Sequence, residues 1–276
     1  MQIMARPASA LFAADDKPPG MPATRAGRDL GMGRRSYLSG LVLAVLLTLA
    51  VSCPANAEEP TPYAKMAPLE QYLMPRDAEI DLARTAAPES ITRNAEIMVL
   101  GPQGYQTAIP GSNGFVCVVE RAWSSPSDDP GFWNPSSRSP ICFNAVAARY
   151  CVPLLKMRTQ LVLAAISKPG IVAKMKAAQA AGEFPPLEPG AMCFMMAKGG
   201  RLNDAAGHWH PHVMFFMPLD QKPDWGTDLP GSPVIAATDD IDRVRIFMVP
   251  VTKWSDGSDE TQPEVCLPST NSSMRK

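Results

Sequence analysis

Phe115-Val116-Cys117-Val118-Val119 is the stretch of sequence that most constrains the fold. All five side chains are apolar, so an extended segment here is hydrophobic on both faces. A strand that is apolar on both faces is typical of the interior of a sheet, where other elements cover it. The segment is therefore predicted to be a central strand of the protein's main sheet.

Two further strands are predicted immediately before it. Apolar and β-branched residues predominate in the first two, 96–100 and 105–109, and the third strand extends over 115–121. The connections at 101–104 and 110–114 are rich in Gly, Pro and Asn, the residues that favour tight turns. Short strands separated by such turns predict a β-meander, in which each strand pairs antiparallel with the next one along the chain.

Three helices are predicted next to these strands. The first covers 77–87 and ends before a proline. The second covers 144–166, where Pro153 either kinks the helix or starts a new one. The third covers 171–181; Ser167 is placed to cap its start and a glycine follows its end.

The C-terminal half predicts further strands. Segments 192–197 and 213–217 are expected to pair, and 243–251 supplies another strand. The intervening loop at 124–140 carries two aromatic residues, so it either packs on the domain or forms a binding surface. The order of strands, helices and strands predicts an α+β fold, with a single antiparallel sheet and helices packed on one face.

The expected domain organisation has four parts. They are a leader and secretory signal peptide over 1–57, a Pro-rich lead-in with a short helix over 58–94, a globular α+β domain over 95–256, and a mobile tail over 257–276. No internal repeat is evident.

The N-terminal region predicts export. Arg34-Arg35 precede the apolar run 41–51, which is followed by Ala55-Asn56-Ala57, and these are the three parts of a signal peptide. We expect cleavage after Ala57 and a periplasmic or extracellular protein. Met32 is a candidate initiator, because a signal peptide that starts there has an ordinary length. The alternative is a lipoprotein attached through Cys53, which follows a small serine.

Composition limits the partners. The chain has 26 Lys and Arg against 27 Asp and Glu, a net charge of −1, and no basic cluster of the kind that follows a phosphate backbone. Nucleic acid is therefore not an expected partner. No second long apolar segment follows the signal, so no transmembrane segment is expected after cleavage.

Five cysteines follow the predicted cleavage site: Cys117, Cys142, Cys151, Cys193 and Cys266. Some should pair in an oxidising compartment, and an odd number leaves at least one without an intramolecular partner. Cys142 and Cys151 cannot pair if both lie on one helix, because nine residues span about 13 Å and a disulfide allows about 4.4–6.8 Å between Cα atoms. The other pairings stay open, and several of these cysteines can equally be small buried apolar residues.

The strongest hint of chemistry is a histidine cluster. All three histidines of the chain, His208, His210 and His212, lie at alternate positions of one short segment. Side chains at alternate positions of an extended chain share a face, and imidazole is a common ligand of transition metals. Two of them together with a distant residue could hold one ion, or all three could do so if the chain bends at Pro211.

This cluster predicts a site for zinc or copper, or for a small ligand. Further metal ligands are offered by Asp204, Glu120, Cys117 and Cys193, and the ligand groove is expected to include Trp209, Asp204 and Trp133. The methionines of the neighbouring strands also suit copper, although core packing is their commoner role. In the metal-free interpretation, the histidines line a groove or form hydrogen bonds across the end of the sheet.

Two other classes of function stay open. One is a hydrolase-like enzyme, with or without metal, in which one of these histidines acts as a base. The other is a non-catalytic envelope protein that presents this surface to a partner. No nucleophile elbow, phosphate-binding glycine loop or His-Glu-x-x-His motif occurs, so the sequence identifies no catalytic residue.

Five short motifs of the chain stand out together: Asn113-Gly114-Phe115-Val116-Cys117, Phe132-Trp133-Asn134-Pro135, Pro140-Ile141-Cys142-Phe143-Asn144, Gly190-Ala191-Met192-Cys193 and His208-Trp209-His210-Pro211-His212. In these motifs the chain resembles a family of uncharacterised exported bacterial proteins. The resemblance covers about residues 90–256. It implies a bacterial exported protein and carries no activity or cofactor.

Overall fold

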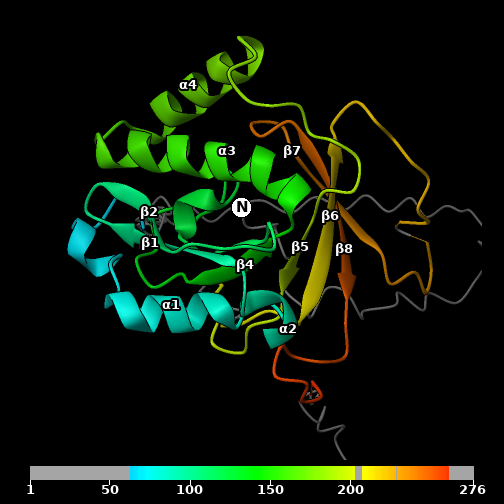
Figure 1. The fold of residues 1–276 in the computed structure, drawn as a ribbon. Helices are drawn as coiled ribbons and strands as arrows, with labels where there is room; N and C mark the ends of the chain where they lie inside the picture. The colour runs from blue at the N-terminus through cyan, green and yellow to red at the C-terminus, as the bar shows by residue number, and fades with distance from the viewer. Residues whose placement is uncertain (1–62, 203–206, 228, 261–276) are drawn as a thin grey trace, which may run out of the picture.

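The apolar stretch at 115–119 forms an inner strand, as predicted. In a computed structural model, which describes residues 63–202, 207–227 and 229–260, the strand β3 (Val116–Glu120) has β1 on one side and β4 on the other. It belongs to one eight-stranded sheet with the order β2-β1-β3-β4-β5-β6-β8-β7 (Figure 1).

The other elements have the following bounds. The strands are β1 Glu96–Gly101, β2 Gly104–Ile109, β4 Ser139–Phe143, β5 Met192–Met195, β6 His212–Pro218, β7 Ile235–Asp239 and β8 Val244–Pro250. The helices are η2 Leu69–Gln71, α1 Arg76–Arg84, α2 Glu89–Thr92, η3 Ala122–Ser124, α3 Ala145–Leu163 and α4 Lys168–Ala180. This arrangement is of the α+β class.

The prediction of a purely antiparallel sheet was wrong, because β3 pairs with β1 in parallel. β1 and β2 form the predicted antiparallel hairpin. After β2 the chain crosses the start of β1, so β3 lies on the other side of β1 and not beside β2. The amides of Ser112 and Asn113 donate to the carbonyl of Asn94 at 2.8 and 3.3 Å. A Cβ on Gly111 would lie 2.1 Å from the nitrogen of Glu96, so only glycine lets the two backbones pass.

Helices lie on both faces of the first strands, and the expectation of a single covered face was also wrong (Figure 1). Alternate residues of the strands face opposite ways. Ile97 and Cys117 pack in a core with Ile80 and other residues of and after α1. Their neighbours Met98 and Val118 belong to a larger core that includes many residues of α3. Two helical layers therefore cover this half of the sheet.

The helix predictions were close. In α3 the Asn144 side chain caps the start by accepting from the amide of Ala147 at 2.8 Å, and the helix continues through Pro153 without a break. Ser167 caps α4 as predicted, by accepting from the amide of Gly170 at 3.4 Å. Gly182 follows α4 in the left-handed conformation, with a φ of 69°.

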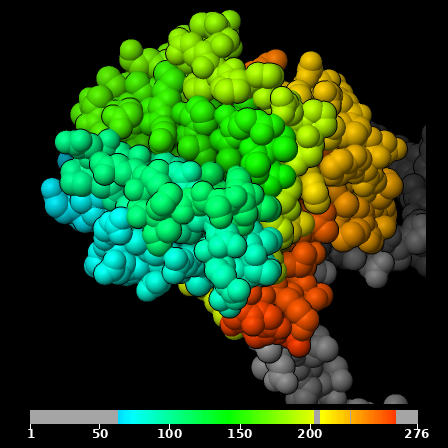
Figure 2. Space-filling model, in the orientation of Figure 1, coloured from blue at the N-terminus to red at the C-terminus, as the bar shows by residue number. Residues whose placement is uncertain are grey.

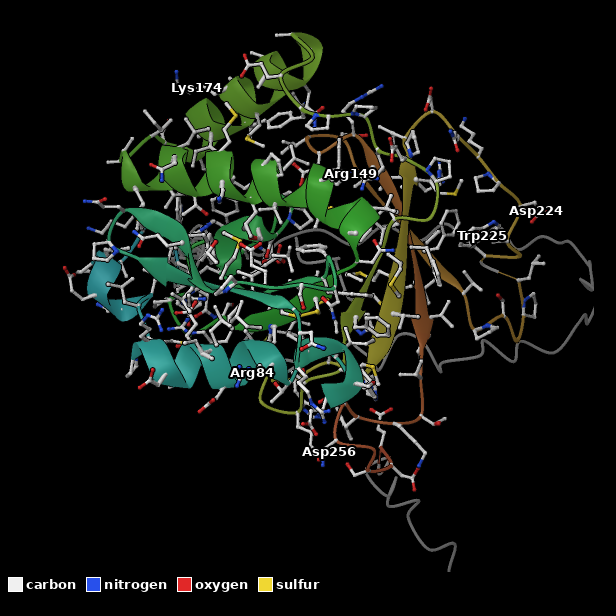
Figure 3. All side chains as sticks on the ribbon, in the orientation of Figure 1. Arg84, Arg149, Lys174, Asp224, Trp225 and Asp256 are labelled. Carbon is white, nitrogen blue, oxygen red and sulfur yellow. A yellow bond between two sulfur atoms is a disulfide. The ribbon has the colours of Figure 1, made fainter. Side chains whose placement is uncertain are left out.

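The C-terminal strands pair as expected, with two additions. β5 pairs with β6, and β6 with β8, all antiparallel. Strand β7 at the far edge and strand β4 between the two halves were not predicted. The face of β6 and β8 that α3 does not cover is partly covered by the connection after β6, where the Trp225 ring lies 4.3 Å from that of Phe247 (Figure 3).

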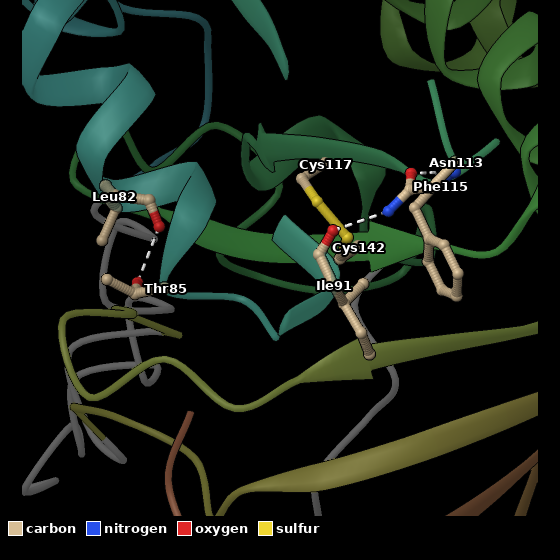
Figure 4. Close-up of a disulfide and its surroundings, with 7 residues drawn as sticks. All are labelled: Leu82, Thr85, Ile91, Asn113, Phe115, Cys117 and Cys142. Atoms are coloured by element: carbon tan, nitrogen blue, oxygen red, sulfur yellow. Dashed lines mark hydrogen bonds between the residues drawn. A yellow bond between two sulfur atoms is a disulfide. The ribbon is translucent and has the colours of Figure 1, made fainter. Parts of the chain in front are cut away.

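One disulfide joins Cys117 of β3 to Cys142 of β4, which face each other directly in the register (Figure 4). The bond lies under α1 and α2, where the Asn113 side-chain amide donates to the carbonyl of Ile91 at 2.8 Å. Cys151 and Cys193 are buried free thiols. This pairing was one of those that the sequence left open.

Several predictions concern residues outside the described part of the chain. The signal peptide, its cleavage after Ala57, the alternative at Cys53, the pairing of Cys266 and the position of Asp204 all fall there. Within the described residues, no helix is long and apolar enough to cross a membrane.

Candidate functional site

The histidine segment lies where three stretches of chain meet, at the end of the sheet where β5 and β8 finish and β6 begins. These stretches are 196–202, 207–212 and 251–260. The amide of Val251 donates to the carbonyl of Pro211 at 2.8 Å, and the amide of Ser255 donates to the carbonyl of Met196 at 3.0 Å. In Figures 1 and 2 the third stretch is the orange-red segment below the sheet.

The register of the sheet explains this meeting. β6 and β8 are antiparallel, and His212 at the start of β6 pairs with Pro250 at the end of β8. The chain before β6 and the chain after β8 therefore leave the sheet at the same end. β5 ends there too, because Met195 pairs with His212.

The three imidazoles occupy different environments and do not share one face. Only His212 belongs to a strand, because Gly207 has a φ of 69° and Pro211 precedes the first strand residue. His212 is 5% exposed, whereas the side chain of His210 is 55% exposed. Residues 207–211 are therefore not part of a strand, and the alternation expected for an extended segment does not apply to His208 and His210.

His212 points into the protein. Its Nδ1 lies 2.7 Å from the carbonyl oxygen of His210, which makes Nδ1 the donor, and its ring lies 6.4 Å from that of Trp209. Burial lowers the pKa of His212 to about 4, because a charged imidazole would lose its hydration there. His212 is therefore neutral at physiological pH.

His210 points outward and pairs with a carboxylate. Its Nδ1 contacts Oε1 of Glu260, whose own amide donates to the carbonyl of Thr252 at 2.9 Å. The Glu260 side chain is only 14% exposed, so its position is well constrained. A carboxylate that fixes the orientation and tautomer of an imidazole is found beside both catalytic bases and metal-bound histidines.

His208 lines an open cleft of about 760 Å³. Its ring lies 6.2 Å from that of Trp254. The other lining residues are Lys198, Gly199, Gly200, Arg201, Gly207, Ser258 and Asp259. The volume is within the range of about 300–1,000 Å³ that is usual for small-molecule sites.

Trp209 supports the cleft from inside. It is 7% exposed, and its Nε1 donates to the carbonyl of Met195 at 3.2 Å. A Cβ on Gly200 would lie 2.5 Å from the indole ring, so the glycine lets the loop 198–201 lie flat on Trp209. The loop backbone is thereby held at the cleft wall.

The charges around the cleft form surface pairs. Nζ of Lys198 lies 2.7 Å from Oδ2 of Asp256, a residue that Figure 3 labels on the segment after β8. Nζ of Lys253 lies 2.7 Å from Oδ1 of Asp259. All four side chains are at least half exposed, and such pairs contribute little stability, so a bound ligand can replace them at small cost.

The described residues contain no group of three or more His, Cys, Asp or Glu side chains placed to hold a metal. Among the further ligands that the sequence offered, Cys117 is in the disulfide, and Cys193 is buried with a strongly raised pKa owing to desolvation. Glu120 lines a separate internal cavity.

Trp133, which was expected in the ligand groove, lies in the main core. It is 7% exposed, its ring meets that of Phe132 edge to face at 4.6 Å, and the Tyr72 hydroxyl donates to its carbonyl at 2.7 Å. The loop 124–140 therefore packs on the domain, which was one of its two interpretations. Trp133 is not among the residues that line the cleft.

Sequence reasoning missed Lys198, Arg201, Trp254 and Glu260. The available signal for the first two was the run Lys-Gly-Gly-Arg, a basic turn shortly before the histidines. Trp254 lies just before the tail predicted from residue 257, and Glu260 lies within it. The chain folds back on itself here, because the amide of Trp254 donates to the carbonyl of Ser258 at 2.9 Å. Residues 257–260 therefore pack against the segment that precedes them.

No family model, curated protein or solved structure matches this chain.

Proposed function

We propose that this is an exported protein that binds a small anionic molecule, one carrying a carboxylate or phosphate group, in the cleft beside His208. The observation that carries the proposal is the convergence of Lys198, Arg201 and His208 around one open cleft. The lysine and the arginine can make charge-assisted hydrogen bonds to such groups, which are stronger than bonds between neutral partners, and the imidazole offers a further ring nitrogen for hydrogen bonding.

The glycines of the wall add a second reason. Gly199, Gly200 and Gly207 line the cleft without side chains, so a ligand can approach the backbone there. Trp254 supplies an apolar surface beside the cationic groups. A few polar groups next to an aromatic ring are typical of sites for small organic ligands.

Export is supported by the predicted signal sequence and by the disulfide between Cys117 and Cys142, since disulfides persist in oxidising compartments. N-terminal sequencing of the protein recovered from the exported fraction tests this part. A mature chain that begins at Glu58 supports cleavage after Ala57, and a lipid-modified Cys53 supports the alternative anchor.

The binding test compares two probes of the same shape, benzoate and its uncharged amide benzamide, by thermal unfolding and calorimetry. Benzoate should raise the unfolding temperature with saturation, because a ligand that binds only the folded state stabilises it by mass action. Benzamide should have no effect. Inorganic phosphate is a third probe, which tests the charge without a ring.

The variants Lys198→Gln and Arg201→Gln should weaken benzoate binding by about tenfold each, equivalent to about 1.4 kcal/mol. Lys222→Gln is a matched control, since this lysine lies on the connection after β6 and does not line the cleft. Equal affinity for benzoate and benzamide, or equal loss in the control, would refute the proposal.

The zinc or copper site stays a prediction. Elemental analysis of the exported protein tests it, and near-stoichiometric metal that is lost in His208→Ala, His210→Ala or His212→Ala protein would support it. No metal after incubation with each ion would leave the anion as the ligand.

A second candidate function is favoured by the pair of His210 and Glu260. An exposed imidazole held by a carboxylate is suited to act as a general base in a hydrolase-like reaction. Turnover of an ester such as 4-nitrophenyl acetate, lost in both His210→Gln and Glu260→Gln but kept in His208→Gln, would support the enzyme. Equal background rates in all variants would exclude this use of His210.

A further inference from the structure

Lys198, one of the cationic residues of the proposed anion cleft, is paired with a carboxylate of the protein itself. Its Nζ lies 2.7 Å from Oδ2 of Asp256, a residue labelled in Figure 3. Lys198 lines the cleft, and Asp256 is not among the lining residues. The ammonium group is therefore directed toward a carboxylate outside the cleft wall, although it lies within reach of a molecule in the cleft.

The carboxylate of Asp256 is held in place by its own turn. Its Oδ1 accepts from the amide of Ser258 at 3.0 Å and from the hydroxyl of the same serine at 2.5 Å. The amide of Gly257 donates to the carbonyl of Trp254 at 3.0 Å, which closes the turn. The bond from Lys198 and the two bonds from Ser258 hold the pKa of Asp256 well below its usual range, so this carboxylate stays charged.

The two partners differ in their freedom to move. The amide of Ser255 donates to the carbonyl of Met196 at 3.0 Å, so a backbone bond within two positions of each partner keeps Lys198 and Asp256 side by side. The lysine side chain is long, flexible and 50% exposed. The carboxylate is thus fixed, whereas the ammonium group can turn from Asp256 to a molecule in the cleft.

The strength of the pair suits an exchange of partners. Both side chains are at least half exposed, and ion pairs of this kind are weak. Competition with such a pair lowers the affinity of an incoming acid group by about twofold to fivefold. A ligand with its own negative charge gives Lys198 an equivalent ionic partner, which a neutral ligand cannot do.

We infer, on the basis of the proposed function, that Asp256 is an internal competitor for the acid group of the ligand and limits the affinity of the cleft for anions. Lys198 pairs with Asp256 when no anion is bound and turns to the carboxylate or phosphate of the ligand when one is. The turn around Asp256 stays in place during this exchange, because the bonds from Ser258 hold it without the lysine.

The test is a double-mutant cycle on the protein from the exported fraction, with calorimetry of benzoate binding. Asp256→Asn should strengthen benzoate binding by about twofold to fivefold, because the amide is uncharged and releases Lys198. The asparagine oxygen can still accept from the amide of Ser258, so the turn is kept. In Lys198→Gln protein the same change should bring little gain, since no ammonium group remains to be released.

Asp259→Asn is the matched control. Asp259 lines the cleft and pairs at the same distance of 2.7 Å with another lysine, Lys253. Its loss removes the same charge, so the control measures the general effect of the local field on an anion. The effect of Asp259→Asn should be the same with and without Lys198→Gln.

The outcomes separate the role of Asp256 from the proposed function. Unchanged or weaker benzoate binding in Asp256→Asn, or an equal gain with and without Lys198→Gln, would overturn the role of Asp256 and leave the anion cleft in place. If benzoate binds neither the natural protein nor Asp256→Asn, the proposed function is wrong, and the competitor role is wrong with it.

Discussion

Acid should destabilise the protein through His212, and the size of the effect follows from the burial of this one residue. The imidazole is 5% exposed, and burial lowers its pKa from 6.5 to about 4. In the unfolded chain the same group takes up a proton near its ordinary pKa. Below that pH the unfolded state therefore binds more protons than the folded state, and stability is lost as the pH falls from about 6.5 toward 4.

The magnitude comes from the difference between the two pKa values. Each pKa unit corresponds to about 1.4 kcal/mol, so the whole shift is worth about 3 kcal/mol, of which about 2.5 kcal/mol is lost between about pH 7.5 and about pH 4.5. The burial is nearly complete, so solvent screening does not reduce this figure substantially.

The assay is urea unfolding at these two pH values for the natural protein, His212→Asn and His210→Asn. An asparagine cannot be protonated in this range, and its amide can still donate to the His210 carbonyl. His212→Asn should therefore lose about 2.5 kcal/mol less than the natural protein on acidification. His210→Asn is the comparison variant, because it removes a neighbouring imidazole that is half exposed and leaves the buried one in place. Equal acid losses in all three proteins would refute the reasoning.

Three further predictions concern the fold, each measured as the free energy of unfolding. Gly111→Ala should destabilise the protein by about 2–3 kcal/mol through overpacking against β1, whereas Gly101→Ala, whose Cβ would meet nothing closer than 3.7 Å, should show only the ordinary effect of a surface change. Ala165→Gly should stabilise it by about 1 kcal/mol, because Ala165 has a φ of 54° after α3, a conformation that glycine adopts at lower cost; a loss of stability would contradict this. The double change Cys117→Ala with Cys142→Ala should cost about 3–4 kcal/mol for a separation of 25 residues, and reduction of the natural protein should cost the same.

Local features of the fold were well predicted from the sequence because short-range chemistry determines them. The hairpin of β1 and β2 follows from its turn residues, and α4 begins at the serine that can cap it. In each case the deciding contacts are only a few residues apart. A single sequence contains all the information that such elements need.

The order and direction of strands depend on contacts that are not local. The parallel pairing of β1 with β3 rests on the passage of Gly111 beside the start of β1, and in the sequence that glycine is indistinguishable from an ordinary turn residue. β4 was missed because it contains Pro140, and a proline argues against an inner strand. Here Pro140 pairs with Val119 within the sheet, so tertiary packing overrides the local rule.

The candidate site shows the same contrast between local features, which the sequence predicts, and contacts between distant segments, which it does not. The occurrence of all three histidines in one segment drew attention to the region that we propose as the site, and alternation along a strand then predicted that the three side chains share one face. The alternation rule applies only where a chain is extended and paired, and in this segment that condition begins at His212. The groups that define each environment, Trp254 beside His208 and Glu260 beside His210, come from a stretch about 50 residues later. They reach the histidines because β6 begins and β8 ends at the same edge of the sheet. The strand register, and not the histidine spacing, therefore determines which groups surround each imidazole.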